Sequence, residues 1–153
     1  MRFLRITKDN WTDAIRLMPK RGQYRYVRKE GVLYSMAKAF VSKQGEYTPL
    51  VIEEDGKLVG AIRVRNYGHG IGFAAFFIDR RCQGKGLGRK AVRNLVQWVR
   101  ENYPKAVEIE TAVDPDNAVA RALYESEGFS YTGVVSATGV LDMEMSLKPP
   151  CNR

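Results

Sequence analysis

Residues Ile78 to Val99 read IDRRCQGKGLGRKAVRNLVQWV, and this stretch decides the fold. Just before it, residues 73–78 form an apolar run that is typical of a strand covered on both faces. Within it, apolar residues recur at helical spacing from Leu87 onward. Three glycines at 84, 86 and 88 allow a loop whose N–H groups point into one concavity. The stretch therefore predicts a strand, an anion-binding loop and a helix whose N-terminus faces the same anion.

Two common phosphate-binding motifs do not fit this loop. A Walker P-loop that begins at Gly84 needs Gly-Lys-Ser or Gly-Lys-Thr at 89–91, where this chain has Arg-Lys-Ala. A dinucleotide-binding fingerprint needs a third small residue where Arg89 stands. The pattern that remains is Gln83-x-x-Gly86-x-Gly88.

A second informative stretch is DPDNAVARALYESEGF, residues 114–129. Asn117 can cap a helix there, and Gly128 is suited to end it in the left-handed conformation. We expect this helix to turn Val119, Ala122 and Leu123 inward.

Together the two stretches resemble the GNAT (GCN5-related) family of N-acetyltransferases. The first is similar to the family's acyl-CoA pyrophosphate loop, which also lies between a strand and a helix. The second, Asn-Ala-x-Ala-x-x-Leu-Tyr-x-x-x-Gly-Phe, is similar to the family's next motif and follows at the expected distance. The resemblance implies an enzyme that moves an acetyl group from acetyl-CoA directly to a primary amine of a small molecule, with no metal.

The fold class expected is α/β, of the α+β type. The order β-α-α-β-β-β-α-β-α-β-β matches the family, which implies a mixed, mostly antiparallel twisted sheet of about six to seven strands with about four helices. We expect one acetyltransferase domain at 1–148 and a short tail at 149–153. The expected strands are residues 3–7, 50–53, 58–64, 73–78, 107–113, 130–135 and 141–147. The first expected helix is capped by Asn10 or Thr12, carries Trp11, Ile15 and Leu17 and stops by Pro19. The other helices lie within 24–41 and begin near 87 and 118.

The resemblance also implies which residues hold acetyl-CoA. Main-chain groups of Phe77 and Ile78 would pair with the pantetheine arm, and Asn117 would bind the arm from the other side. The pyrophosphate would lie on the loop, which comprises Gln83, Gly84, Lys85, Gly86, Leu87, Gly88 and Arg89.

Two proton transfers complete the expected chemistry. By family position, Tyr124 is the general acid that protonates the departing thiolate. The attacking amine must be neutral, although an alkylamine with a pKa near 10.4 is almost wholly charged at pH 7. The residues alone leave the general base open among Glu110, Asp79 and His69, each of which is also readily explained as a surface or turn residue.

Composition sets the remaining expectations. The chain has 153 residues, 44% of them hydrophobic, which is enough for a core, and no apolar run approaches the roughly 20 residues that span a bilayer. We expect a cytoplasmic protein that does not enter a membrane, with Cys82 and Cys151 as free thiols. Dimers are frequent in the family, so a homodimer is left open, although no residue pattern marks an interface.

The distribution of charged residues along the chain is relevant to which amine acts as the acceptor. Residues 1–43 hold eleven Lys or Arg against three acids, which equals the whole net charge of +8. This block argues against a polyamine acceptor and is compatible with an anionic partner, but no RNA-binding signature supports a nucleic acid. Two alternatives remain: acetylation of a protein or peptide amine, and an acyl-CoA sensor without turnover. A weak likeness to the bacterial spermine and spermidine acetyltransferases nevertheless keeps a polyamine possible as the acceptor. This likeness rests on Asn10-Trp11, Gln23, Val27, Ser35, Ala37, Ala39 and Phe76-Phe77-Ile78-Asp79.

Overall fold

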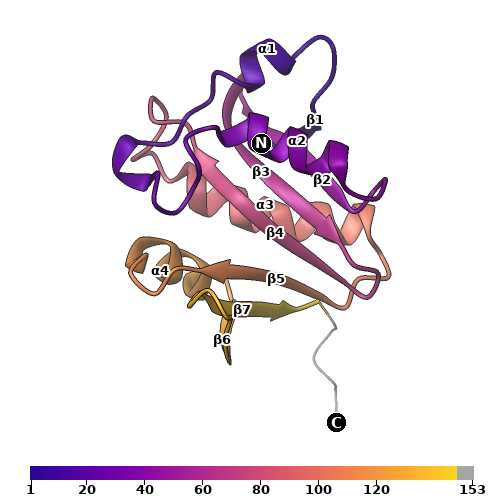
Figure 1. Ribbon diagram of the computed structural model, residues 1–153, viewed down its shortest axis with the longest axis vertical. Coiled ribbons are helices and arrows are strands. Elements are labelled where there is room, and N and C mark those ends of the chain that lie inside the picture. Colours follow the sequence, from indigo (N-terminus) through magenta and orange to yellow (C-terminus); the bar gives the residue numbers. More distant parts are fainter. Residues whose placement is uncertain (148–153) are drawn as a thin grey trace.

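The computed structural model describes residues 1–147 and contains one twisted seven-stranded sheet (Figure 1). The strand order is β1-β2-β3-β4-β5-β7-β6, and every neighbouring pair is antiparallel except β4 and β5. The strands are β1 (Arg2–Arg5), β2 (Tyr47–Glu54), β3 (Lys57–Asn66), β4 (Gly70–Ile78), β5 (Glu108–Val113), β6 (Ser130–Val135) and β7 (Leu141–Ser146). The helices are α1 (Trp11–Ala14), α2 (Gly31–Val41), α3 (Leu87–Asn102) and α4 (Ala118–Ser126), with a 3₁₀ turn η1 (Arg21–Gln23).

This architecture confirms the expected fold class and element order. The long helix begins at Leu87, as its apolar spacing predicts, and the Asp55-Gly56 turn joins β2 to β3 with φ values of 51° and 75°. The expected tail 149–153, with Cys151, and residue 148 of the expected domain lie outside the described residues. Within residues 1–147, no helix combines the length and the apolar character needed to cross a bilayer.

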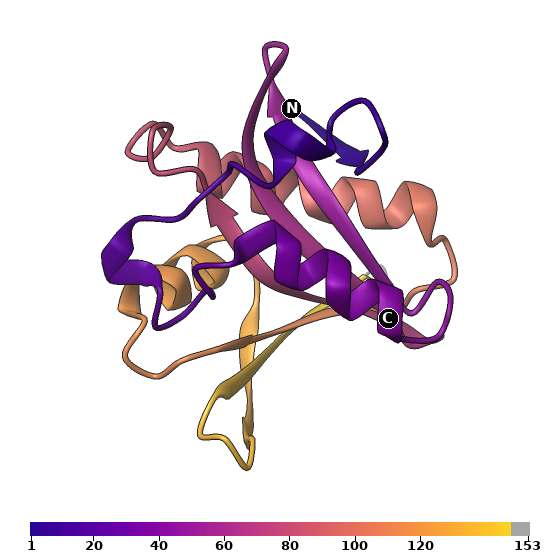
Figure 2. The same cartoon turned by 45° about the horizontal axis from the view of Figure 1, so that its top comes forward.

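Helices cover both faces of the sheet (Figure 2). On one face α3 buries Val92, Leu95 and Val99 against strand residues such as Phe73 and Ile109. On the other face α1 and α2 pack over β2 and β3, where a smaller apolar cluster includes Ala14, Val32, Val51, Ala61 and Phe77. The two faces follow the alternation of side chains along the strands, except in β4, where an irregularity at Ala75 puts Phe73 and Phe77 on opposite faces.

The first helix is shorter than expected. It ends at Ala14 and does not reach Leu17, and the Asn10 side chain makes no capping bond. Asn10 instead accepts a hydrogen bond from the Thr7 amide at 2.8 Å and donates one to the Arg5 carbonyl at 3.0 Å. Its amide group thus stabilises the turn before the helix, which the sequence pattern does not distinguish from a cap.

The inward face of α4 also differs from the prediction. Val119 is 82% exposed and Ala122 is exposed, whereas Ala120, Leu123 and Tyr124 turn inward. The helix is therefore rotated so that its tyrosine is buried.

The parallel strands β4 and β5 are paired only over their first halves. Four residue pairs join them, from Gly70 with Glu108 to Phe73 with Thr111. Beyond these pairs the strands diverge toward their C-terminal ends (Figure 1). Ala75, with φ of 51°, forms an irregularity in the β3–β4 ladder at the point of divergence. One edge of β4 is consequently left without a partner strand where the glycine loop begins.

Candidate active site

The glycine loop adopts the conformation that the sequence predicts. Gly84 and Gly86 have φ values of 80° and 73°, and Gly86 immediately precedes α3. The helical hydrogen bonds of α3 begin with the Lys90 amide, which donates to the Gly86 carbonyl at 3.2 Å. The N–H groups of residues 87–89 therefore have no intrahelical acceptor and can bind an anion, which the positive end of the helix dipole also attracts.

A cavity of about 540 Å³, which we call the loop cavity, opens between this loop, the free edge of β4, and α4. The segment from Gln23 to Val27 forms another part of its wall. The predicted residues that line it are Phe77, Ile78, Gln83, Gly84, Gly86, Leu87, Gly88, Asn117 and Tyr124.

The predicted cations around the loop are placed less favourably. Lys85 and Arg89 do not line the loop cavity. Arg89 lies 3.7 Å from a carboxylate oxygen of Glu127, and Lys90 forms an ion pair with Glu54. Within residues 1–147, Lys85 is the loop cation without a carboxylate partner, so main-chain amides supply most of the anion-binding capacity.

Gln83 stabilises the loop from within. Its side-chain amide donates to the Ile78 carbonyl and to the Gln23 side chain, each at 2.8 Å. The same side chain therefore ties the end of β4 to the 23–27 segment that borders the cavity. Its position in the motif is thus explained by loop geometry as well as by contact with a ligand.

The main-chain N–H and C=O groups of Ile78 and Phe77 point to opposite sides of β4. The Asp79 amide donates to the Val59 carbonyl of β3 at 2.8 Å. Because successive residues of a strand turn their main-chain groups to opposite sides, those of Ile78 face the gap and those of Phe77 face β3. The Ile78 main chain is therefore better placed than that of Phe77 for an added strand-like partner.

Asp79 is a structural carboxylate and not a base candidate. Its side chain is 1% exposed and does not line the loop cavity. It accepts hydrogen bonds from the Met18 amide at 3.0 Å, from the Arg81 amide at 3.0 Å and from Arg81 Nε at 2.7 Å. Burial alone would raise the pKa of Asp79, but the bonds from Arg81 and from the Met18 amide outweigh burial and hold its pKa below the ordinary value.

We expect Asp79→Asn to lower the free energy of unfolding by roughly 1–3 kcal/mol, because the amide cannot accept all of these bonds. The pKa of Asp79 is lower in the folded chain than in the unfolded chain. The wild-type advantage is therefore complete above about pH 4 and is lost as the pH falls through the folded value. Urea unfolding from pH 7 to pH 3 measures this. Asp13→Asn, in an exposed pair with Arg16, is the matched control.

Asn117 and Tyr124 border the loop cavity from α4. The Asn117 side chain accepts a hydrogen bond from the Ala120 amide at 3.2 Å, which confirms it as the helix cap. The Tyr124 ring packs edge-on against Phe73, with ring centroids 5.5 Å apart. Burial raises the pKa of Tyr124, and hydrogen bonding to Thr111 opposes this only in part. The phenol therefore keeps its proton over the working pH range.

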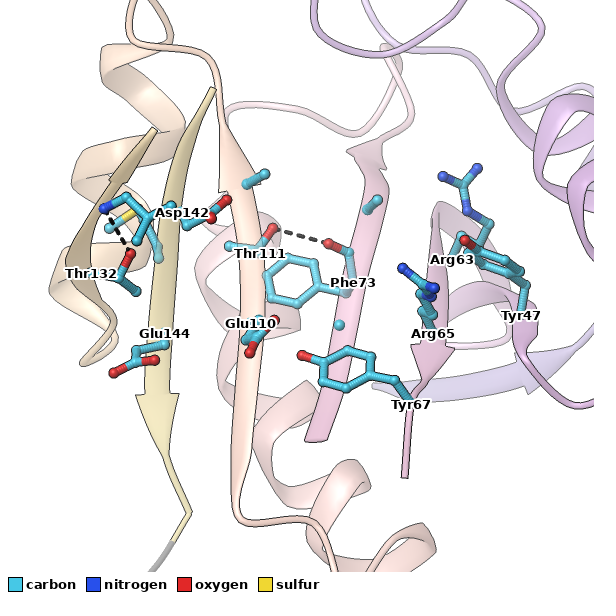
Figure 3. Close-up of a pocket in the computed structure, with 15 residues that line it drawn as sticks. Tyr47, Arg63, Arg65, Tyr67, Phe73, Glu110, Thr111, Thr132, Asp142 and Glu144 are labelled. Atoms are coloured by element: carbon cyan, nitrogen blue, oxygen red, sulfur yellow. Dashed lines mark hydrogen bonds between the residues drawn. The ribbon is translucent and has the colours of Figure 1, made fainter. Parts of the chain in front are cut away.

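A second cavity, of about 480 Å³, lies across the sheet face that α2 partly covers; we call it the sheet cavity (Figure 3). Strand pairing aligns Tyr47, Arg65, Gly72, Glu110 and Glu144 in one row across β2, β3, β4, β5 and β7. Gly72 has no side chain at the centre of this row, and the Tyr67 ring lies over it, 3.2 Å from the position that a Cβ would take.

The sheet cavity has two walls of opposite charge. Arg63 and Arg65 come from β3, whereas Glu110 comes from β5, and Asp142 and Glu144 come from β7. Figure 3 shows the arginines and the carboxylates on opposite sides of the cavity. Of the three residues that the sequence left open as the general base, only Glu110 lines the sheet cavity.

Tyr67 adds a buried hydroxyl to the sheet cavity. Its side chain points toward Glu110 (Figure 3) and completes no hydrogen bond with any described residue. Burial first, and then the carboxylates of Glu110 and Glu108, raise its pKa. His69 lies outside the cavity on the β3–β4 turn, 3.2 Å from Glu108.

The two cavities meet where β4 and β5 part. They share Ala74, Thr111 and Ala112 as lining residues. Thr111 is buried and donates a hydrogen bond to the Phe73 carbonyl at 3.0 Å, which closes the last paired position of the two strands. A group in the loop cavity can therefore reach a group in the sheet cavity at this junction.

Sequence reasoning missed most of the sheet cavity. It did not select Arg63, Tyr67, Thr111, Asp142 or Glu144, because each is defined by its neighbours on other strands. The pairing of β5 with β7, and not with β6, brings two of them to the site. The repeated charges at i and i+2, as in Arg63 and Arg65, are a signal that could have indicated a polar stripe on one sheet face.

This fold and this pair of connected cavities define an enzyme that transfers a group between two separately bound substrates. The chain matches the Acetyltransferase (GNAT) family over residues 8–129 and belongs to it. It is therefore an acetyltransferase, and acetyl-CoA is the co-substrate that the loop cavity fits.

Comparison with individual proteins agrees with this assignment. The chain is 30% identical over 142 residues to the spermine/spermidine N(1)-acetyltransferase of Bacillus subtilis strain 168, with 88% of this chain and 90% of the relative covered. Among solved structures, an aminoglycoside acetyltransferase in complex with coenzyme A has a TM-score of 0.75 at 21% identity, with coverages of 95% and 94%. Spermidine N-acetyltransferase from Vibrio cholerae, in complex with CoA and spermine, has a TM-score of 0.73 at 18% identity, with coverages of 95% and 94%.

Proposed function

We propose that the protein transfers the acetyl group of acetyl-CoA directly to a primary amine of a small molecule. The observation that carries this proposal is the junction of the two cavities at Ala74, Thr111 and Ala112. A thioester that enters from the loop side and an amine that enters from the sheet side would meet there without a covalent enzyme intermediate. The names of the Bacillus subtilis relatives place spermine and spermidine among the amines to be tested.

Acetyl-CoA supplies the activated acetyl group. The amides that follow Gly84 and the N-terminus of α3 would bind its diphosphate. The main chain of Ile78 would bind the pantetheine arm along the open edge of β4, and Asn117 and exposed Val119 would border the arm on the α4 side. Lys85 and Arg89 would contribute charge at longer range.

Tyr124 is proposed as the general acid. When the amine nitrogen bonds to the acyl carbon and the C–S bond breaks, the sulfur needs a proton and the nitrogen must lose one. A cysteine-like thiol has a pKa near 8.5, below that of the phenol, so the proton must pass to sulfur as the C–S bond breaks. The raised pKa of buried Tyr124 keeps that proton available until departure begins.

Glu110 is proposed to help the amine lose its proton. It is the base candidate that reaches the sheet cavity, and Asp142 lies nearby on β7. The carboxylates would first attract the ammonium form and then accept its proton directly or through water.

A thiol-release assay with acetyl-CoA tests this function. We expect coenzyme A to appear only when a primary amine is present, and the acetylated amine to appear in equal amount. Release without an amine would indicate hydrolysis. Tight acetyl-CoA binding with no release from any amine or peptide would indicate an acyl-CoA sensor and would overturn the proposal.

Location and assembly stay predictions. We propose, from composition and family resemblance, a cytoplasmic enzyme with a single catalytic domain, and the family's frequent dimers make a homodimer the first assembly to test. Light scattering at several protein concentrations measures the mass of the assembly directly.

A further inference from the structure

The sheet cavity contains a cation that has no carboxylate partner. Arg63 is half-buried and, within residues 1–147, forms no ion pair, whereas neighbouring Arg65 lies 3.1 Å from Glu46. The Arg63 guanidinium lies 5.5 Å from the Tyr34 ring and 5.6 Å from the Tyr47 ring. It also donates one long hydrogen bond of 3.5 Å to the Ser35 hydroxyl. These contacts orient the fork-shaped donor and leave most of its N–H groups unused.

The opposite wall has the complementary property. Glu110 and Glu144 are directly opposite each other on antiparallel strands, a pairing of like charges that is unfavourable without a cation. Asp142 lies two residues from Glu144 on the same side of β7. In the described part of the chain, none of these three carboxylates has a basic partner. A bound ammonium group would relieve their repulsion.

The two walls are close enough for one small molecule. Arg65 pairs with Gly72, and Gly72 pairs with Glu110, so the basic and acidic strands are separated by β4 alone. Two strand spacings amount to about 10 Å between main chains, and the side chains shorten that gap. Arg63 pairs with Ala74, which lines both cavities. The basic wall of the sheet cavity therefore extends to the point where the two cavities meet.

We propose that the acceptor carries an anionic group, a carboxylate or a phosphate monoester, in addition to the primary amine. The amine lies against Glu110, Asp142 and Glu144, and the anion is bound by the Arg63 guanidinium. This inference rests on the proposed function and narrows its substrate class. A polyamine has no group for Arg63, and its additional ammonium groups would face that guanidinium.

Matched pairs of amines test the proposal on the wild-type enzyme. The pairs are ornithine and putrescine, β-alanine and propylamine, and phosphoethanolamine and ethanolamine, with spermidine as a separate polyamine. We expect the member with the anion to have the higher kcat/KM, by roughly tenfold or more in at least one pair, as one charged hydrogen-bonded contact predicts. The carboxylate and phosphate pairs show which anion is preferred. A higher kcat/KM for the plain amine in every pair, or for spermidine over all of them, would overturn the inference and leave the proposed function standing.

Arg63→Gln should remove the preference selectively. We expect kcat/KM to fall for the anion-bearing member of the preferred pair and to stay the same or rise for the plain amine. Arg100→Gln, on α3 at the opposite face of the sheet, should leave both values unchanged. Equal losses for both members in Arg63→Gln would indicate a structural role and contradict the inference.

Calorimetric binding separates this inference from the proposed function. If no amine releases thiol, the proposed function fails, and the same pairs are compared by titration into the protein with coenzyme A. Preferential binding of the anion-bearing member supports the inference, and equal or absent binding of both members overturns it.

Discussion

Tyr124→Phe is expected to lower kcat by roughly 10²-fold or more and to leave the affinity for acetyl-CoA nearly unchanged. The substitution removes one oxygen atom, while the ring contacts with Phe73 and Phe129 remain. The loss therefore falls on protonation of the departing thiolate and not on cofactor binding. Steady-state kinetics measure kcat, and calorimetry with coenzyme A measures affinity.

The control for this substitution is Tyr131→Phe. Tyr131 lies on β6, is partly exposed and lines neither cavity, so its hydroxyl should be dispensable. A second readout is the pH profile. Because burial raises the pKa of Tyr124, its ionisation should cause no loss of wild-type rate up to about pH 10. Unchanged turnover in Tyr124→Phe would exclude the phenol as the general acid.

Gly86→Val is expected to weaken acetyl-CoA binding by roughly 10²-fold or more, which corresponds to the loss of one or two charged hydrogen bonds. Gly86 has φ of 73°, a conformation that a β-branched residue avoids, so the loop must change shape and its amides must leave the diphosphate. Within residues 1–147, no atom from beyond the neighbouring residues lies within 4 Å of a Cβ built there, so the substitution causes no clash in the core. Calorimetric titration with coenzyme A measures the change.

Backbone strain by itself is controlled with Gly45→Val. Gly45 has φ of 81°, and a Cβ there also has open space, but the residue lies in the turn before β2 and lines neither cavity. We expect the two variants to lose similar amounts of stability, of order 1–2 kcal/mol, and only Gly86→Val to lose cofactor binding. Normal binding in Gly86→Val would contradict the role of the glycine loop.

The parts of the fold that follow from local sequence were predictable. The apolar spacing of α3, the Asp55-Gly56 turn and the Asn117 cap depend on residues close together in the chain, and the structure confirms all three. Local patterns were misleading for short helices. The Asn10 side chain forms a hydrogen bond with the preceding Thr7 amide and does not cap α1. Val119 is exposed at the loop cavity because the burial of Tyr124 sets the rotation of α4.

The candidate site was predictable only on one side. The loop cavity is formed by two contiguous motifs, and most of its proposed residues could be selected from their order. The roles predicted for Lys85 and Arg89 stay predictions: neither residue lines the loop cavity, and the position of the Glu127 carboxylate near Arg89 could not be foreseen because it lies at the far end of another helix. The sheet cavity depends on strand register across β2 to β7. Charges repeated at i and i+2, as in Arg63 and Arg65, indicate a polar sheet face but not which strands lie side by side, so the opposite charges of the two walls could not be predicted.

The short β4–β5 ladder has a mechanical consequence. Strands β1 to β4 and strands β5 to β7 are joined in the sheet by four residue pairs only, with Phe73 and Thr111 the last of them. Rotation of one part of the sheet against the other about this seam is consequently the softest large-scale motion we expect of the unliganded protein. A ligand that bridges the open ends of β4 and β5 would restrict this rotation. Binding of the first substrate would therefore make the binding site of the second substrate more rigid.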